Sequence, residues 1–301
     1  MSEIGNEPVT RAQSELDEAK KIAEILDVPI DQIHVLDMQP GKPETLQIRT
    51  PAKTDHSQMK LGKRSPRRDP RTLRLAKYFA PAPMPLPPDS VDWSKGITSW
   101  GMMLNDNLGD CTIAACGHAI QVWSANGGEE ITVPDDAILT AYESWDGYNP
   151  KDPDSDQGGV EIDVLNQWRA SQLAGHALMA YADPDPQNDY HVKFSIAYFG
   201  GIYIGLALPA SAQSQEVWDV ADGANGEPGS WGGHAVFVCG YDADGLTCIT
   251  WGQLKRMTWA FWRKYCDEAH ALIGQDWLRQ GVSPDGFDMF SLVTDLHAVT
   301  G

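Results

Sequence analysis

Two residues that could act as a nucleophile and its base lie far apart in this sequence. Cys111 follows the polar loop 104–110 and opens an apolar, alanine-rich run that is typical of a buried helix. A helix N-terminus favours the thiolate, the nucleophilic form of cysteine, through its unpaired N–H groups and its positive dipole end. His234 follows two glycines and opens an apolar, strand-like run. A cysteine at a helix start and a histidine on a distant strand form the usual pair of a cysteine hydrolase.

The surrounding residues fit this chemistry less well. Asp110 is a good helix N-cap, but its charge opposes the effect of the helix dipole on the neighbouring thiol. Cys116 is expected to pack in the core, and His118 lies two turns, or about 10 Å, from Cys111, too far to be its base. No Cys-x2-Cys pair occurs, so we expect no structural zinc and no other metal. We assign no role to five further histidines: His34, His56, His191, His270 and His297.

Several motifs around these two residues resemble those of the papain-like cysteine peptidases. They follow the family's order over roughly 210 residues, from about Val91 onward. The resemblance rests on an Asp-Trp-x-x-x-Gly-x-x-Thr-like start, a Gly-x-Cys loop, a Gly-Gly-helix segment, a His-Ala-Val strand and a Trp-Gly pair, at residues 91–98, 109–111, 157–173, 234–236 and 250–252. It implies that Gly158 and Gly159 line the substrate cleft and that Trp251 shields the base from water.

The resemblance also suggests two supporting roles, each at a position where this sequence departs from the family. Asn105 occupies the place of the oxyanion-hole glutamine, with Asn107 as a nearby alternative. Thr250 stands where the family has the asparagine that orients the imidazole, and Gln253 is the alternative. The backbone N–H of Cys111 would supply the second oxyanion donor.

We therefore predict an α+β fold with two halves, preceded by an extended N-terminal arm. The helical half carries Cys111 and the antiparallel β half carries His234. Predicted helices are 10–26, a helix from Cys111 ended by Gly127-Gly128, 134–145, 162–173, 189–199 and 258–274. Predicted strands are 176–181, 201–208, 234–241, 246–250 and 290–299. The insertion 213–233 would form one wall of the cleft.

Charge divides the chain into three parts: an acidic segment 1–48, a basic and then proline-rich arm 49–90, and the peptidase-like domain 91–301. Residues 49–77 contain ten Lys or Arg and two Asp, a local charge of +8 in a chain of net charge -19. Four interpretations compete for this arm: a solvated tail, a prosegment that folds back on the acidic body, a nucleic-acid contact, or docking on an acidic protein partner. We favour docking.

The acidic loop 146–161 raises the question of a calcium site. Its ligands, Asp146, Asp152, Asp154, Asp156 and Glu161, lack the regular spacing of a calcium loop. We therefore interpret the loop as a cleft rim that favours basic or polar substrates.

Two functions remain open. The first is a peptidase that hydrolyses peptide or isopeptide bonds, without a cofactor. The second is an inactive papain-like fold that serves as a structural protein of an assembly such as a tailed-phage virion. The acidic body argues against nucleic-acid or anionic-membrane binding. Five cysteines and no signal-like or membrane-spanning run favour a cytoplasmic or virion-associated protein with free thiols.

Overall fold

A computed structural model describes residues 55–67, 73–78 and 86–278, and these belong to one compact unit. The predicted helix 10–26 and strand 290–299 lie outside the described residues. Within the described residues the fold is α+β, as predicted, with two buried apolar cores. One core joins the helices to one side of the sheet, and the other lies within the strand-rich half.

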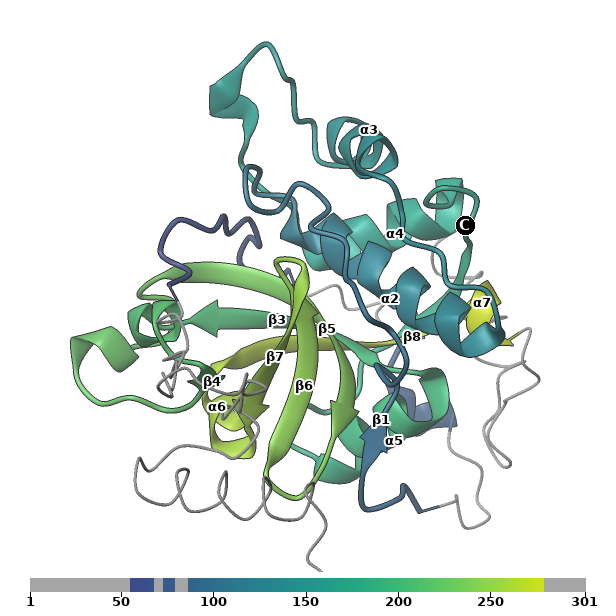
Figure 1. Cartoon of the computed structure of the whole chain (residues 1–301), viewed down its shortest axis with the longest axis vertical. Helices are drawn as coiled ribbons and strands as arrows, with labels where there is room; N and C mark the ends of the chain where they lie inside the picture. The colour runs from purple at the N-terminus through teal and green to yellow at the C-terminus, as the bar shows by residue number, and fades with distance from the viewer. Residues whose placement is uncertain (1–54, 68–72, 79–85, 279–301) are drawn as a thin grey trace, which may run out of the picture. The chain divides into compact units, whose positions relative to one another are not determined.

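The helical half is built around α2 (Cys111–Gly127), which begins at the cysteine that the sequence singles out. Its first fourteen residues are buried, so the alanine-rich run is a central helix of the core. It ends as predicted, because Gly128 takes the left-handed conformation (φ 116°) that glycine adopts freely. Helices α3 (Asp135–Trp145) and α4 (Glu161–Ser171) lie beside it (Figure 1).

The other half is a mainly antiparallel sheet with the strand order β2-β8-β3-β5-β6-β7-β4, to which β1 adds by pairing with β5. The strands are β1 (Val91–Asp92), β2 (Leu178–Ala182), β3 (Ile202–Leu208), β4 (Val217–Trp218), β5 (Gly232–Tyr241), β6 (Gly245–Thr250), β7 (Gln253–Thr258) and β8 (Cys266–Gly274). The predicted strands 234–241 and 246–250 correspond to β5 and β6, which pair with each other as an antiparallel hairpin. The remaining elements are η2 (Leu75–Tyr78), η3 (Pro153–Ser155), α5 (Asp189–Phe199), η4 (Ala210–Gln213), η5 (Ala224–Gly226), α6 (Trp259–Tyr265) and α7 (Gln275–Leu278).

The prediction of one helix over residues 258–274 was wrong. Helix α6 ends at Tyr265, and the next residue begins strand β8, which pairs with β2 on one side and β3 on the other. The strand is buried along most of its length, so its apolar residues do not alternate with polar ones and periodicity does not separate it from a helix. Sheet pairing on both edges decides its conformation.

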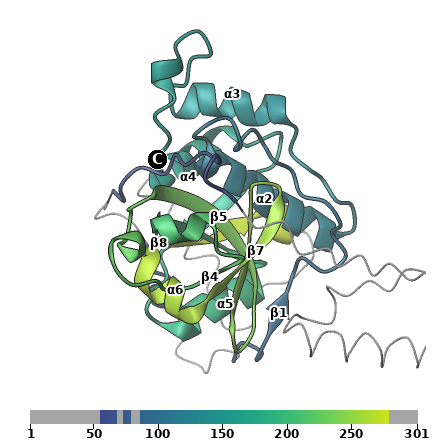
Figure 2. The same cartoon turned by 60° about the vertical axis from the view of Figure 1, so that its left-hand side comes forward.

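Residues 55–67 of the basic arm lie across both halves (Figure 1, purple, and Figure 2). Lys63 forms a parallel bridge with Gly159, which precedes α4. The backbone N–H of Lys63 also donates to the carbonyl of Gly233, at the start of β5, over 3.1 Å. At Lys63 the arm therefore contacts both the helical half and the sheet.

Candidate active site

Cys111 lies at the first position of α2 and is 1% exposed. Its sulfur receives a hydrogen bond from the backbone N–H of Ala235, with a distance of 3.4 Å between nitrogen and sulfur. Ala235 directly follows His234 on β5, so the helix start and this strand meet at the sulfur although 124 positions separate the two bonded residues. This is the meeting of distant segments that the sequence suggests.

His234 is fully buried and held by two neighbours. Its Nε2 lies 2.7 Å from the Oγ1 of Thr250, at the end of β6. The ring of Trp251 stacks on the imidazole, with 4.5 Å between centroids and 17° between planes. Among the described residues, Nδ1 of His234 has no hydrogen-bond partner. The histidine is thus fixed at one nitrogen and free at the other.

Burial shifts both ionisation equilibria toward the neutral forms. Burial raises the pKa of Cys111 to about 12, against the opposing effect of the backbone N–H groups of Ala235 and Gly62 that point at the thiol. Burial also lowers the pKa of His234 to about 3. In this conformation the site therefore holds a thiol and a neutral imidazole, whatever the helix dipole contributes.

Asn105 does not present a free amide to the cleft. It is buried, and its Nδ2 donates to the carbonyl of Leu108 over 3.1 Å and to the carboxylate of Asp110 over 3.2 Å. Those two bonds use both hydrogens of the amide. Asp110 is therefore held by Asn105, and its side chain does not cap the helix. Asn107 is exposed.

Gln253 does not contact the imidazole of His234. Its amide lies 3.5 Å from the ring nitrogen Nε2 of His56, which belongs to the arm. His56 in turn stacks on Trp251, with 4.9 Å between centroids. Of the two candidates to orient His234, the geometry brings only Thr250 to it, and Trp251 lies between two histidines.

The arm covers the sulfur at Gly62. A Cβ at Gly62 would lie 1.6 Å from the carbonyl oxygen of Gly109, one of the residues just before Cys111. A Cβ at Gly158 would lie 1.7 Å from the carbonyl oxygen of Gly62. Only glycine allows these backbone segments to approach so closely.

Gly159 pairs with the arm as one strand pairs with another. Its N–H donates to the carbonyl of Gly62, and its carbonyl accepts from the N–H of Arg64, each over 2.9 Å. Gly159 itself is packed against Asp146 and Thr112, leaving no room for a side chain. Of the cleft residues expected from the sequence, both Gly158 and Gly159 contact an extended peptide segment.

Comparison with solved structures identifies the fold. Xylellain, a cysteine protease from Xylella fastidiosa, matches with a TM-score of 0.54 at 14% sequence identity, over 72% of this chain and 96% of that one. The chain has a papain-like fold. The bromelain protease of Ananas comosus, in complex with the E64 inhibitor, matches with a TM-score of 0.45 at 15% identity, over 62% of this chain and 99% of that one. No family model and no curated protein matches the sequence.

Sequence reasoning missed four residues of this papain-like site. Lys63 was noted only as part of a charge run, although its side chain is 1% exposed. His56 and His270 were assigned no role, and Glu268 fell inside the helix that was predicted wrongly. The signal in the sequence that could have indicated Lys63 and Glu268 is charge. The pair Lys63-Arg64 is basic and the pair Asp267-Glu268 is acidic, so the two pairs attract each other if the fold brings them close.

The arm's acidic partner, within the described residues, is the chain itself. Arg67 forms a bidentate ion pair with Asp163 of α4. Arg64 donates to the carbonyl of Gln157 over 3.0 Å. For residues 55–67 these contacts favour the folded-back interpretation over the docking that we expected. All five cysteines are free, and no described helix is long and apolar enough to cross a membrane.

Proposed function

We propose that this papain-like chain is a cysteine peptidase in which Cys111 is the nucleophile and His234 the general base, held latent by residues 55–67. One observation supports the proposal above the others. The imidazole is hydrogen-bonded at Nε2 to Thr250 and has no partner at Nδ1 in the part of the chain that the structure describes, while the residue after it contacts the sulfur of Cys111. A histidine that acts as a general base needs one ring nitrogen held by a hydrogen bond and the other free to accept a proton from a nearby nucleophile.

The reaction follows from these positions. Nδ1 of His234 accepts the thiol proton, and the sulfur attacks the substrate carbonyl to give a tetrahedral oxyanion. The backbone N–H of Cys111 stabilises that oxyanion, a contribution of roughly 3 kcal/mol for one donor. The imidazolium then gives its proton to the leaving amine, and water hydrolyses the thioester by the same route in reverse. Thr250 holds the ring in place throughout.

The covering arm explains why the pKa values of Cys111 and His234 keep both groups neutral and unreactive. Gly62 covers the sulfur, so water and substrate are both excluded, and desolvation keeps the thiol and the imidazole neutral. Release of the arm would hydrate the pair, lower the pKa of Cys111 and raise that of His234. Both shifts favour transfer of the proton from sulfur to nitrogen.

A full-length triple variant tests the proposal. Lys63→Glu and Arg67→Glu reverse the charges that hold the arm to Asp267, Glu268 and Asp163. Arg64→Glu removes the donor to the carbonyl of Gln157, and the three changes together should lift the arm from the cleft. Lys60→Glu is the matched control, because Lys60 lies in the same arm with an exposed side chain. A thiol-directed epoxide probe, read by mass spectrometry, should label Cys111 rapidly in the triple variant and slowly in the wild type and the control.

The role of His234 needs its own comparison. Adding His234→Ala to the triple variant should reduce labelling of Cys111 to the rate of an ordinary thiol, because the base is lost. Equal labelling with and without His234 would show that the imidazole does not activate the sulfur, and the peptidase proposal would fall.

One observation favours the rival function, an inactive scaffold with the same fold. Both amide hydrogens of Asn105 are used inside the protein, so the expected oxyanion donor is occupied. A scaffold would leave Cys111 no more reactive than a free thiol in the triple variant. The labelling experiment therefore separates the two functions.

A further inference from the structure

The side chain of Lys63 fills a pocket beside the proposed catalytic pair. Its Nζ lies 3.0 Å from a carboxylate oxygen of Asp267 and 3.1 Å from one of Glu268, both on β8. Its aliphatic stem passes over Gly205 of β3, where a Cβ would lie 1.9 Å from Cε of the lysine. The missing side chain at Gly205 thus leaves the space that the stem occupies.

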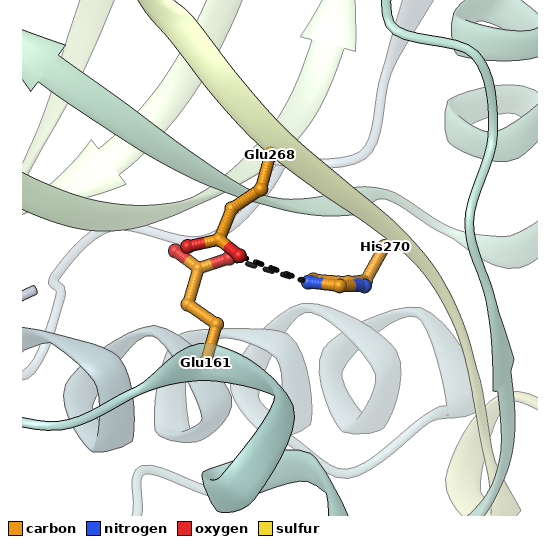
Figure 3. Close-up of side chains that lie close together, drawn as sticks. All are labelled: Glu161, Glu268 and His270. Atoms are coloured by element: carbon orange, nitrogen blue, oxygen red, sulfur yellow. Dashed lines mark ion pairs between the residues drawn. The ribbon is translucent and has the colours of Figure 1, made fainter. Parts of the chain in front are cut away.

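The inner wall of this pocket carries Glu161 and His270, shown in Figure 3 with Glu268. Glu161 comes from the start of α4 and is completely buried, and neither of its carboxylate oxygens has a hydrogen-bond partner among the described residues. Nε2 of His270 lies 3.6 Å from Glu161 and 3.8 Å from Glu268. Two carboxylates from different halves of the molecule therefore converge at one point.

The acidic side chains of this pocket favour a cationic group beside them. Burial lowers the pKa of His270, but its 2.7 Å contact with Asp183 and the nearby glutamates raise it to about 10, so the imidazole is charged. The imidazolium of His270 faces the carboxyl groups of Asp183, Glu161 and Glu268. Burial raises the pKa of Glu161 well above its usual value, so this group is charged only with cations beside it. Burial alone would also lower the pKa of Lys63, yet the charges of Glu161, Glu268 and Asp267 outweigh burial and hold it above its usual value.

A lysine stem and ammonium match the pocket better than a metal ion. Glu161, Glu268 and His270 offer ligand atoms within 4.8 Å of one another, which is a possible metal geometry. The ammonium of Lys63 already contacts Glu268, however. The missing side chain at Gly205 makes room for the aliphatic stem of a lysine, and a metal ion has no such stem. The imidazolium charge of His270 also disfavours its use as a metal ligand.

We propose that this pocket, lined by Glu161, Asp267, Glu268 and Gly205, is a specificity pocket for a lysine or arginine side chain of the peptide substrate. The inference rests on the proposed peptidase function. Lys63 reaches the pocket because its backbone pairs with Gly159 and Gly233 next to the sulfur. A substrate strand that pairs with the same backbone groups places one of its side chains in the same pocket. An apolar side chain there would take the lysine counter-charge away from the buried Glu161 and the largely buried Glu268.

Peptide binding in trans tests the pocket without requiring catalysis. The protein is the full-length chain with the arm-lifting triple substitution and Cys111→Ala, which prevents turnover. The probe is a fluorescent peptide with the sequence of residues 55–67, and binding is read by anisotropy. Peptide Lys63→Leu should bind at least about 30-fold more weakly, because it leaves buried charges unpaired. Peptide Lys63→Arg should bind within about 5-fold of the original, since it keeps the charge.

Two controls complete the test. Peptide Lys60→Leu should bind like the original, because the side chain of Lys60 is exposed. In the protein, Glu268→Gln should reduce the preference for lysine over leucine, whereas Glu227→Gln, at an exposed position, should preserve it. Equal binding of the lysine and leucine peptides would overturn the inference.

The two proposals fail in different ways. If Cys111 is not activated by His234, labelling fails but the lysine preference in binding persists. If the pocket has no specificity, labelling of Cys111 succeeds in the triple variant, but the lysine and leucine peptides bind equally to its Cys111→Ala form.

Discussion

Nε2 of His234 lies 2.7 Å from Oγ1 of Thr250, at the position where the papain-like motif has an asparagine. The hydroxyl can accept the Nε2–H, which fixes the neutral tautomer whose Nδ1 carries a lone pair. That is the tautomer a general base requires. In the proposed mechanism Thr250 takes the place of the asparagine in orienting the ring, because the end of β6 brings its hydroxyl within hydrogen-bond distance of the imidazole.

Replacing Thr250 tests this relationship. In the arm-lifted background, Thr250→Val removes the acceptor while keeping the shape, and the rate of Cys111 labelling should fall roughly 10- to 100-fold because the ring loses its orientation. Thr250→Ser keeps the hydroxyl and should stay close to the parent. An unchanged rate in Thr250→Val would remove Thr250 from the proposed machinery.

The arm should also be displaced by a single methyl group. Gly62→Ala places a Cβ 1.6 Å from the carbonyl oxygen of Gly109, an overlap that movement of the arm would relieve. We expect the full-length variant to label at Cys111 at least about 10-fold faster than the wild type, the effect of roughly 1–3 kcal/mol of overpacking. Lys60→Ala is the matched control and should label like the wild type. Equally slow labelling of both variants would show that Gly62 does not close the site.

Trp251 should matter for stability as well as for the site. Its ring stacks on His234 and on His56, and it is 3% exposed. Trp251→Ala should lower the free energy of unfolding by about 3–5 kcal/mol, as expected for loss of a large buried aromatic ring. Trp251→Phe retains an aromatic face and should cost less. Chemical denaturation measures both, and a cost below 1 kcal/mol for the alanine variant would contradict this packing role.

Much of the fold could be predicted from the sequence because its signals were local. The start of α2 at Cys111 and its end before Gly128 follow from a polar loop, an apolar run and two glycines. Helix α5 was predicted with its observed bounds. Strand β8 could not be predicted, since its conformation is set by partners on both edges that are distant in the sequence.

Part of the candidate site was also predictable from local signals. Short motifs mark Cys111, His234, Thr250 and Trp251. The pocket around Lys63 was not, because its charges come from the arm, from α4 and from β8. Glu161 was noted as part of an acidic loop, but no spacing in the sequence reveals that it meets Glu268. The engagement of Asn105 with Asp110 likewise depends on how the loop folds back.

His118 should make the protein sensitive to acid. It is buried, and burial lowers its pKa to about 4 despite its hydrogen bond to the carbonyl of Gly101. Because its pKa in the unfolded chain is about 6.5, its contribution is fully present above that pH and is lost as the pH falls toward 4. The loss amounts to about 3 kcal/mol across this window.

His118→Gln cannot take up a proton and should remove that part of the pH dependence. The measurement is the free energy of unfolding at pH 7 and at pH 4.5, for the wild type and the variant. His191→Gln is the comparison: burial lowers the pKa of this histidine too, but it is only partly buried, so its replacement should remove a smaller part of the pH dependence. An equal loss of stability in the wild type and in His118→Gln would show that His118 is not the group responsible.

The most direct test of the central claim is hydrolysis of an unstructured protein by the arm-lifted chain. We expect new fragments, detected by mass spectrometry, in the Lys63→Glu, Arg64→Glu, Arg67→Glu variant, and none when Cys111→Ala or His234→Ala is added. The absence of fragments from the arm-lifted chain, or fragments that persist without Cys111, would contradict the account.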